Sequence, residues 1–385
     1  MRSPVSPAAR RMGRGTLRAG WLRGGYEEND PSVSRNVGMR DSIFGGLPLG
    51  NDFWNKVIAV AKMEFTMSVV PEPSLHPTNA SQLRCLSTES RLMRFCRLAA
   101  VKLATLSCFN SSQGLWGENK SFWNLPLSKR QKLQIGSYII LRDFGEGLFP
   151  PTFDDQQKAY EAEINYRFNL PGTTPATASI ADLRKPFWDG PAMRRYMANF
   201  MDLTCALERC HVHPPQRLLE LGCGGGWMAE FLALMGFSVV GTTISPHDIV
   251  DAENRVASLK LKGLSADLKF RKTPMESVAE ATCDLEPFDA TFVFEALHHA
   301  FDWRKAIDSV FDCLKPGGWL LICNEPNWIH TFSSYRVARL SNTHEVGFLR
   351  RDLMDHLKQK GFQEVSILKN SLHFRVKPHW IAAKK

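Results

Sequence analysis

The sequence lacks the features that mark membrane-spanning, disulfide-bonded or metal-clustered proteins. No run approaches the roughly 20 uncharged apolar residues that a membrane-spanning helix requires. The nine cysteines form no C-x-x-C pair, so neither a zinc site nor a disulfide framework is indicated. Cysteines used in this way predict a reducing, cytoplasmic location. Hydrophobic residues make up 44% and charged residues 23%, which excludes a fully disordered or collagen-like chain.

Acidic residues are scarce in the first 40 positions, which hold eight arginines and three acids for a net charge of +5, out of +9 for the whole chain. The rest of the sequence is therefore close to neutral. We interpret residues 1–50 as a disordered basic leader and expect no specific nucleic-acid binding. The composition is also typical of an organelle transit peptide. Upstream sequence read as coding is a further alternative, because Met12, Met39 and Met63 are possible starts.

Residues 51–150 form an uncharacterised, partly helical extension. Within it, the stretch 89–109 predicts a helix with apolar residues on one side and arginines at threefold spacing on another. We expect this helix to pack on its own domain, with weak contact to a membrane surface as the alternative.

Residues 151–214 are predicted to form a helical lid segment. Helices are expected over 154–168 and 191–209, with a Pro/Thr/Ala linker at 171–178 between them. Pro214-Pro215 ends the second helix, because proline cannot continue a helical hydrogen-bond ladder.

Residues 215–385 alternate between strands and helices. The predicted strands cover 217–221, 238–242, 268–271, 289–294 and 319–324, with an antiparallel pair at 365–368 and 380–383. Strand and helix in regular alternation indicate an α/β fold, a Rossmann-like doubly wound sheet that is mostly parallel with an antiparallel C-terminal strand. The residues before position 215 are expected to form a helical or irregular N-terminal extension to this fold.

A glycine-rich turn follows the first predicted strand. It reads E-x-G-x-G-x-G from Glu220 to Gly226, and Trp227 stands where a dinucleotide fingerprint has its third glycine. A carboxylate at Glu220 would repel a pyrophosphate and attract a cation. S-adenosylmethionine (SAM) carries an ammonium and a sulfonium but no phosphate, so the turn favours SAM over a dinucleotide.

The sequence resembles the class I SAM-dependent methyltransferases, particularly the small-molecule branch called methyltransferase type 11. The motifs that carry the resemblance lie in order over about residues 215–370. They are LELGCGGGW, VVGTTIS, FDATFVFEALHHAFDW, CLKPGGWLLICNEP and FLRRDLMDHLKQKGF. The resemblance implies an enzyme that binds SAM and transfers its methyl group by in-line displacement to a small-molecule, lipid-linked or saccharide acceptor. It implies no metal.

The resemblance also assigns roles to individual residues around SAM. Glu220 would orient the amino group, and the turn glycines would give the backbone room. Thr243 stands where the family usually has an acidic ribose ligand, so Thr243 and Asp248 would share the ribose, as in the cyclopropane fatty acid synthases. The full set of expected cofactor-binding residues is Glu220, Gly222, Gly224, Gly226, Thr243, Asp248, Met275, Glu276, Glu295 and Leu297.

Two histidines, His298 and His299, match the family's pair after the fourth strand and are the candidate catalytic bases. A histidine could take the proton of a substrate hydroxyl as the methyl arrives. The alternative is that both are structural. Weaker candidates for the base are His330, His344 and Tyr335, in the insertion after the fifth strand.

Two other functions compete with this prediction. A nucleic-acid methyltransferase of the amino-methylating type would carry a [D/N]-P-P-[F/Y] clamp where this sequence has Phe294-Glu295-Ala296-Leu297. A non-catalytic SAM-fold module that binds a partner is the other alternative, against which the intact glycine turn argues.

Overall fold

The structure is a computed structural model, and it describes residues 91–109, 128–149, 153, 155–169, 174–341, 343, 345–369 and 379–385. The predicted leader, the alternative start residues and His344 lie outside these residues. No helix of the described residues is long and apolar enough to cross a membrane.

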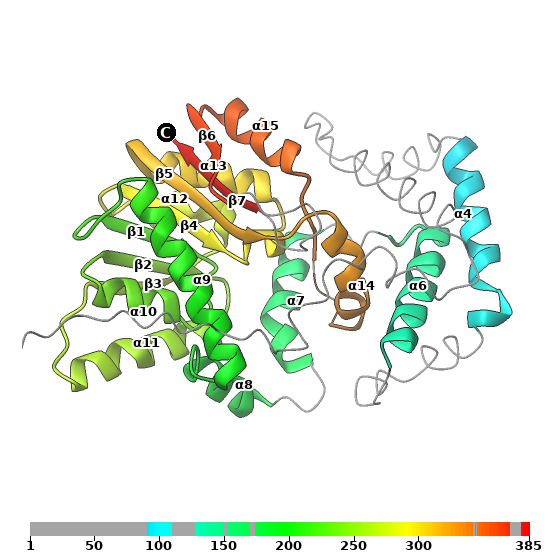
Figure 1. Cartoon of the computed structure of the whole chain (residues 1–385), viewed down its shortest axis with the longest axis horizontal. Helices are drawn as coiled ribbons and strands as arrows, with labels where there is room; N and C mark the ends of the chain where they lie inside the picture. Colours follow the sequence, from blue (N-terminus) through cyan, green and yellow to red (C-terminus); the bar gives the residue numbers. More distant parts are fainter. Residues whose placement is uncertain are drawn as a thin grey trace, which may run out of the picture. The chain divides into compact units, whose positions relative to one another are not determined.

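Seven strands of the described chain form one sheet in the order β3-β2-β1-β4-β5-β7-β6 (Figure 1). Their bounds are β1 Arg217–Leu221, β2 Ser238–Thr243, β3 Leu268–Lys272, β4 Phe288–Phe294, β5 Leu314–Glu325, β6 Glu364–Ile367 and β7 His379–Lys384. Strands β1 to β5 pair in parallel, while β7 runs antiparallel to both β5 and β6. The predicted doubly wound sheet with an antiparallel C-terminal strand is confirmed.

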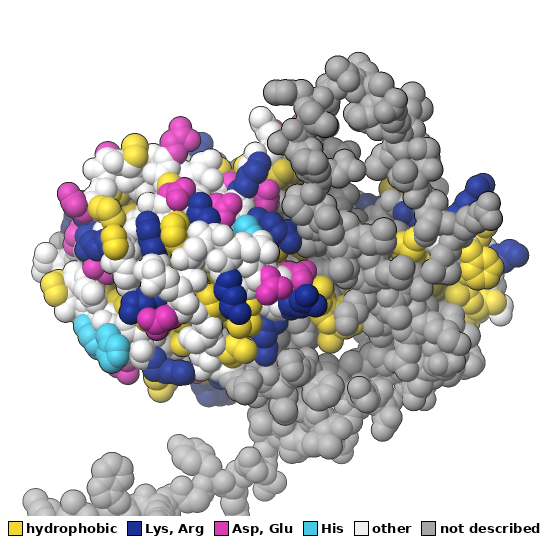
Figure 2. Space-filling model, turned by 90° about the horizontal axis from the view of Figure 1, so that it is seen from above, with side chains coloured by type: hydrophobic (Ala, Val, Ile, Leu, Met, Phe, Trp, Pro, Cys, Tyr) yellow, Lys and Arg dark blue, Asp and Glu magenta, His cyan; other side chains and the backbone are white. Residues whose placement is uncertain are grey.

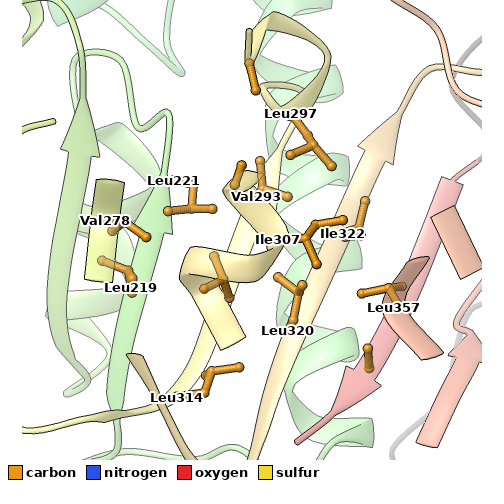
Figure 3. Packing of buried hydrophobic residues seen from close by; sticks show 14 of the residues in the cluster. Leu219, Leu221, Val278, Val293, Leu297, Ile307, Leu314, Leu320, Ile322 and Leu357 are labelled. Atoms are coloured by element: carbon orange, nitrogen blue, oxygen red, sulfur yellow. The ribbon is translucent and has the colours of Figure 1, made fainter. Parts of the chain in front are cut away.

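The two faces of the sheet bury separate hydrophobic clusters. On one face the strands pack against α12 (Val278–Ala281), α13 (Trp303–Cys313) and α15 (Arg350–Lys360), as the side chains of Ile307, Leu320 and Leu357 show in Figure 3. On the other face they pack against α9 (Gly190–Arg209), α10 (Trp227–Leu234) and α11 (Pro246–Leu261). Helices on both faces leave the ends of the parallel strands as the place for a site.

Strand β5 is longer than the sequence predicted. The expected strand began at Trp319, whereas β5 begins at Leu314, directly after α13. Leu314 pairs with Phe288 of β4, and Gly317 donates its N–H to the carbonyl of Lys385. The Pro-Gly-Gly stretch is therefore held as strand by its neighbours, although its residues have low intrinsic strand propensity.

The predicted lid segment, residues 151–214, contains α7 (Gln156–Asn169), α8 (Pro175–Leu183) and α9. The linker prediction over 171–178 is wrong at its C-terminal end, because α8 begins at Pro175. Thr174 caps this helix and exchanges hydrogen bonds with Thr177 in a capping box, while Pro175 takes the first helical turn, where its missing N–H costs nothing.

A separate helical lobe contains α4 (Arg91–Ala104), η1 (Ser107–Phe109), α6 (Lys129–Gly145) and α14 (Ile329–Ser341). The sequence predicted α4, but it left α6 and α14 unassigned. Tyr335 of α14 is fully buried in this lobe and donates a hydrogen bond of 2.8 Å to Asp143 of α6. The insertion after β5 is thus tied to the N-terminal extension by a buried polar contact.

Two short helices follow β3 and β4 at the edge where the parallel strands end. They are η3 (Met275–Ser277) and η4 (Leu297–His299), and together they bring the residues after both strands toward the sheet edge. The space-filling view shows charges of both signs interspersed over the described surface of one face (Figure 2). This mixture agrees with the near-neutral charge that the sequence assigns to the chain after its leader.

Candidate active site

A pocket of about 190 Å³ lies at the carboxyl ends of the parallel strands. Its walls come from the segments that follow β1 to β4 and from α7. The lining residues are Tyr160, Glu163, Gly222, Gly224, Thr243, Ile244, Ser245, Asp248, Thr273, Met275, Glu276, Glu295, Ala296, His299 and Ala300. A second depression, of about 240 Å³, includes the first residues of β1 and β2 at the opposite end of these strands and none of the predicted site residues.

The glycines of the turn have different roles although all three have positive φ. A side chain at Gly224 (φ +51°) would meet nothing within 4 Å, so this glycine borders open space in the pocket. A Cβ at Gly226 would lie 2.5 Å from the ring of Phe270, and one at Gly222 would lie 2.5 Å from the Cβ of Ala296. Gly226 therefore serves helix-to-sheet packing, while Gly224 leaves room for a ligand.

Glu220 is buried at 4% exposure and does not line the pocket. Burial raises the pKa of its carboxyl to about 8, while a hydrogen bond from the backbone N–H of Ala229 works in the opposite direction. The second oxygen, Oε2, has no hydrogen-bond partner. A nearby cation would restore the charged form, because an opposite charge lowers the pKa of a buried acid.

Thr243 and Asp248, the predicted ribose pair, lie together on the pocket wall. The Thr243 hydroxyl donates to the Asp248 carboxylate at 3.4 Å. Ser245 caps α11 by accepting a 3.2 Å hydrogen bond from the N–H of Asp248. Asp248 thus stands in the first turn of a helix, where the dipole favours a negative charge.

Met275 and Glu276 line the pocket, and Glu276 also connects three segments. Its carboxylate accepts hydrogen bonds from the Tyr160 hydroxyl at 2.8 Å and from the Asp302 N–H at 2.9 Å. Burial and the Glu276 carboxylate raise the pKa of Tyr160, so its hydroxyl stays a donor. Glu276 therefore fixes α7 against the pocket.

Glu295 and Leu297, both among the expected cofactor-binding residues, lie in different environments. Glu295 lines the pocket with a left-handed backbone (φ +51°) and accepts a hydrogen bond from Asn324. Leu297 is 1% exposed within the hydrophobic core and is not a lining residue. Its side chain supports the wall of the pocket from the core.

His298 is buried and held by a carboxylate. Its Nδ1 lies 2.8 Å from Oε2 of Glu325, a fully buried residue at the end of β5. The same carboxylate accepts the N–H groups of Ala296 at 2.7 Å and Leu297 at 2.8 Å. This arrangement fixes the turn after β4 and places His298 in the layer beside the pocket.

His299 lines the pocket and faces α7. Its Nδ1 lies 3.2 Å from the Glu163 carboxylate, and its side chain is 31% exposed. Burial alone would lower the pKa of His299, but the carboxylates of Glu163, Glu345 and Glu325 outweigh it and raise the pKa to about 10. His299 therefore carries a positive charge at neutral pH.

No signal in the sequence marked Tyr160 and Glu163 as site residues. Both lie on α7, whose sequence shows almost no amphipathic period, so its inward face could not be identified. A pairing across 116 residues, such as Tyr160 with Glu276, is visible only in the folded chain.

The residues present fit SAM. Among the residues that the structure describes, the pocket is lined by four carboxylates, Glu163, Asp248, Glu276 and Glu295, and by no lysine or arginine. Such a lining opposes a pyrophosphate and suits a cationic ligand. The unpartnered oxygen of buried Glu220 and the open space at Gly224 point the same way.

A doubly wound sheet with an acidic, glycine-floored pocket at the carboxyl ends of its strands defines a class I SAM-dependent methyltransferase domain. Residues 193–367 match the family model described as "Methyltransferase domain". This part of the chain therefore matches a methyltransferase domain, in agreement with the class I SAM-dependent methyltransferase that the motifs predicted.

Curated relatives share the same part of the chain. "Ubiquinone biosynthesis O-methyltransferase" of Ruegeria pomeroyi is 33% identical over 161 residues, which cover 39% of this chain and 60% of the relative. A protein of the same name from Brucella anthropi is 32% identical over 135 residues, or 35% of this chain and 50% of the relative. The matched part of the chain thus spans 60% of the length of the first relative and 50% of the second.

Among solved structures, the magnesium protoporphyrin IX methyltransferase of Synechocystis with bound SAH is similar with a TM-score of 0.43 and 14% identity. The similarity covers 59% of this chain and 99% of that one.

Proposed function

We propose that this chain transfers the methyl group of SAM to an oxygen atom of a small-molecule acceptor. The observation that carries the proposal is the acidic pocket at the strand ends, which has room at Gly224 and His299 on its wall. SAM supplies an electrophilic methyl group when it is bound. The name of the relatives, ubiquinone biosynthesis O-methyltransferase, supports oxygen as the acceptor atom and a lipid-type molecule over a saccharide.

The residues of the chain would position and shield the two reactants. Thr243 and Asp248 would bind the ribose hydroxyls, and the backbone at Gly222 and Gly224 would lie along the methionine part. Tyr160 and Glu276 would close the pocket with α7 and exclude water. Alignment and exclusion of water are the main contributions expected of the protein.

His299 is the better placed of the two candidate catalytic histidines. His298 is buried and tied to Glu325, whereas His299 reaches the pocket. Because the neighbouring carboxylates keep His299 protonated, it would stabilise an acceptor oxygen that has already lost its proton, with Glu163 holding the imidazolium in place. An acidic hydroxyl, such as a phenol, suits this arrangement better than an alcohol.

Weak contact with a membrane surface is part of the proposal, and α4 supports it. The described part of this helix carries Arg94 and Lys102 and exposes Phe95 at 69% and Leu98 at 58%. The described part of α4 therefore presents hydrophobic and basic side chains to solvent. An acceptor with a lipid tail would be met at such a surface. The cytoplasmic location expected from the cysteines stays a prediction.

Incubating the full chain and a cell lysate with deuteromethyl-SAM tests the function without assuming an acceptor. Mass spectrometry should find a labelled small molecule whose label sits on oxygen. A Gly224→Val chain, which fills the space beside the turn, is the control and should give no labelled product. Label only on RNA or DNA would favour a nucleic-acid methyltransferase, and absence of SAM binding by calorimetry would favour a non-catalytic module.

A further inference from the structure

Three side chains with metal-binding atoms meet beside the pocket. They are His298 of η4, His330 of α14 and Glu345, which follows α14, and their ligand atoms all lie within 4.8 Å of one another. Nε2 of His330 is 2.7 Å from Oε2 of Glu345, and Nε2 of His298 is 4.0 Å from the same oxygen. The two imidazole rings are 5.3 Å apart and nearly perpendicular. The sequence predicted no such cluster, because its members are 15 to 47 residues apart.

The cluster has a carboxylate behind one of its histidines. Glu325 lies 2.8 Å from Nδ1 of His298 and also accepts two backbone N–H groups, so its carboxyl oxygens act as acceptors here. Nδ1 of His298 is therefore the protonated nitrogen, and the lone pair of Nε2 is directed to the side where Glu345 lies. A carboxylate that orients a histidine in this way is the usual outer partner of a metal-bound imidazole.

The local charge also favours a cation. Three carboxylates, Glu163, Glu325 and Glu345, are each at most 10% exposed and face His299, His298 and His330. The three carboxylates outnumber the one imidazolium, that of His299, and an excess of buried negative charge is costly without a compensating positive charge. A divalent ion between His298, His330 and Glu345 would provide most of it.

We infer that His298, His330 and Glu345 form a binding site for a divalent transition metal ion of the zinc type. Two imidazoles and one carboxylate are a ligand set that zinc accepts, whereas calcium and magnesium prefer oxygen ligands. Bonds of roughly 2.0–2.2 Å in a tetrahedron place ligand atoms about 3.3 Å apart. The two separations from the Glu345 oxygen, 2.7 and 4.0 Å, bracket that value, so small shifts of the side chains would bring these atoms to it.

The ion would connect the turn after β4 to the insertion after β5. His298 comes from that turn, and its ring lies 4.1 Å from the ring of His299 on the pocket wall. His330 and Glu345 come from the insertion that holds α14. Metal binding would therefore fix the acceptor side of the pocket. The predicted SAM ligands do not include His298, His330 or Glu345, although Glu295 and Leu297 share the turn after β4 with His298.

The site is tested with the full chain, purified without a histidine tag and stripped with a chelator. Titration with Zn²⁺ alone, followed by calorimetry and elemental analysis, should give one ion per chain. His330→Ala and Glu345→Gln should each weaken binding by at least about tenfold. His356→Ala is the matched control, because His356 also pairs with a carboxylate, Asp308 at 3.0 Å, outside the cluster, and it should bind Zn²⁺ like the wild type.

Two further measurements keep the result clear if a variant fails to fold. Co²⁺ added to the wild-type chain should give the strong visible absorption of tetrahedral coordination, and Zn²⁺ should displace it. Binding of less than one Zn²⁺ per wild-type chain, or equal binding by a folded His330→Ala chain, would overturn the inference. SAM titrated into the same samples reports on the proposed function separately, since its predicted ligands do not include the cluster.

Discussion

Replacing Gly224 with alanine distinguishes an effect on SAM binding from an effect on the stability of the fold. The backbone at Gly224 has φ +51°, which costs a residue with a Cβ about 1–2 kcal/mol. No atom lies within 4 Å of the added Cβ, so no clash adds to this cost. For a domain of about 200 residues the expected loss of Tm is roughly 2–8 °C.

Gly263 provides a matched control, because it has φ +70°, also meets nothing within 4 Å, and does not line the pocket. Gly263→Ala should lose a similar amount of Tm and bind SAM normally. Gly224→Ala places a methyl group in the ligand's space, and overpacking of about 1–3 kcal/mol would weaken binding about 5- to 140-fold. Calorimetric titration with SAM measures this difference. Equal affinities of the two variants would refute the placement of SAM beside Gly224.

Three other perturbations test the charges and contacts described above. The carboxyl of Glu220 has a raised pKa, so the folded state keeps its proton between about pH 4.5 and 8 while the unfolded state loses it. The stability of the protein should therefore fall as the pH rises over that range. The Tm of Glu220→Gln should depend less on pH over the same range than the Tm of the wild type. The pKa of His299 is raised from 6.5 to about 10, so its pairing with Glu163 stabilises the fold below pH 6.5 and this stabilisation is lost as the pH rises to 10. Glu163→Gln should lower the pKa of His299 in NMR titrations. His299→Ala should reduce turnover at saturating SAM about 10²- to 10⁴-fold, and unchanged turnover would exclude a role for His299. Tyr335→Phe removes a donor from buried Asp143 and should lower the free energy of unfolding by about 1.5–3 kcal/mol in urea, whereas a loss below 0.5 kcal/mol would show that the contact is not stabilising.

The local sequence was sufficient for the sheet and for the floor of the pocket. Short apolar runs between turn residues predicted all seven strands, six of them to within one residue at each end, and the glycines after β1 predicted the sharp turn. Both follow from rules that act over a few neighbouring positions. The length of β5 was missed, because its first residues are held by pairing with β4 and with the end of the chain.

Only the tertiary structure decided which side chains meet around the pocket. His298 and His299 are adjacent in sequence, yet one is buried against Glu325 and the other lies on the pocket wall opposite Glu163. Their partners come from β5 and α7, far away along the chain. Sequence determines which chemical groups are present and which elements they stand on. Distances, burial and the resulting pKa values depend on how those elements pack, because electrostatic interactions act through space and depend on the local dielectric.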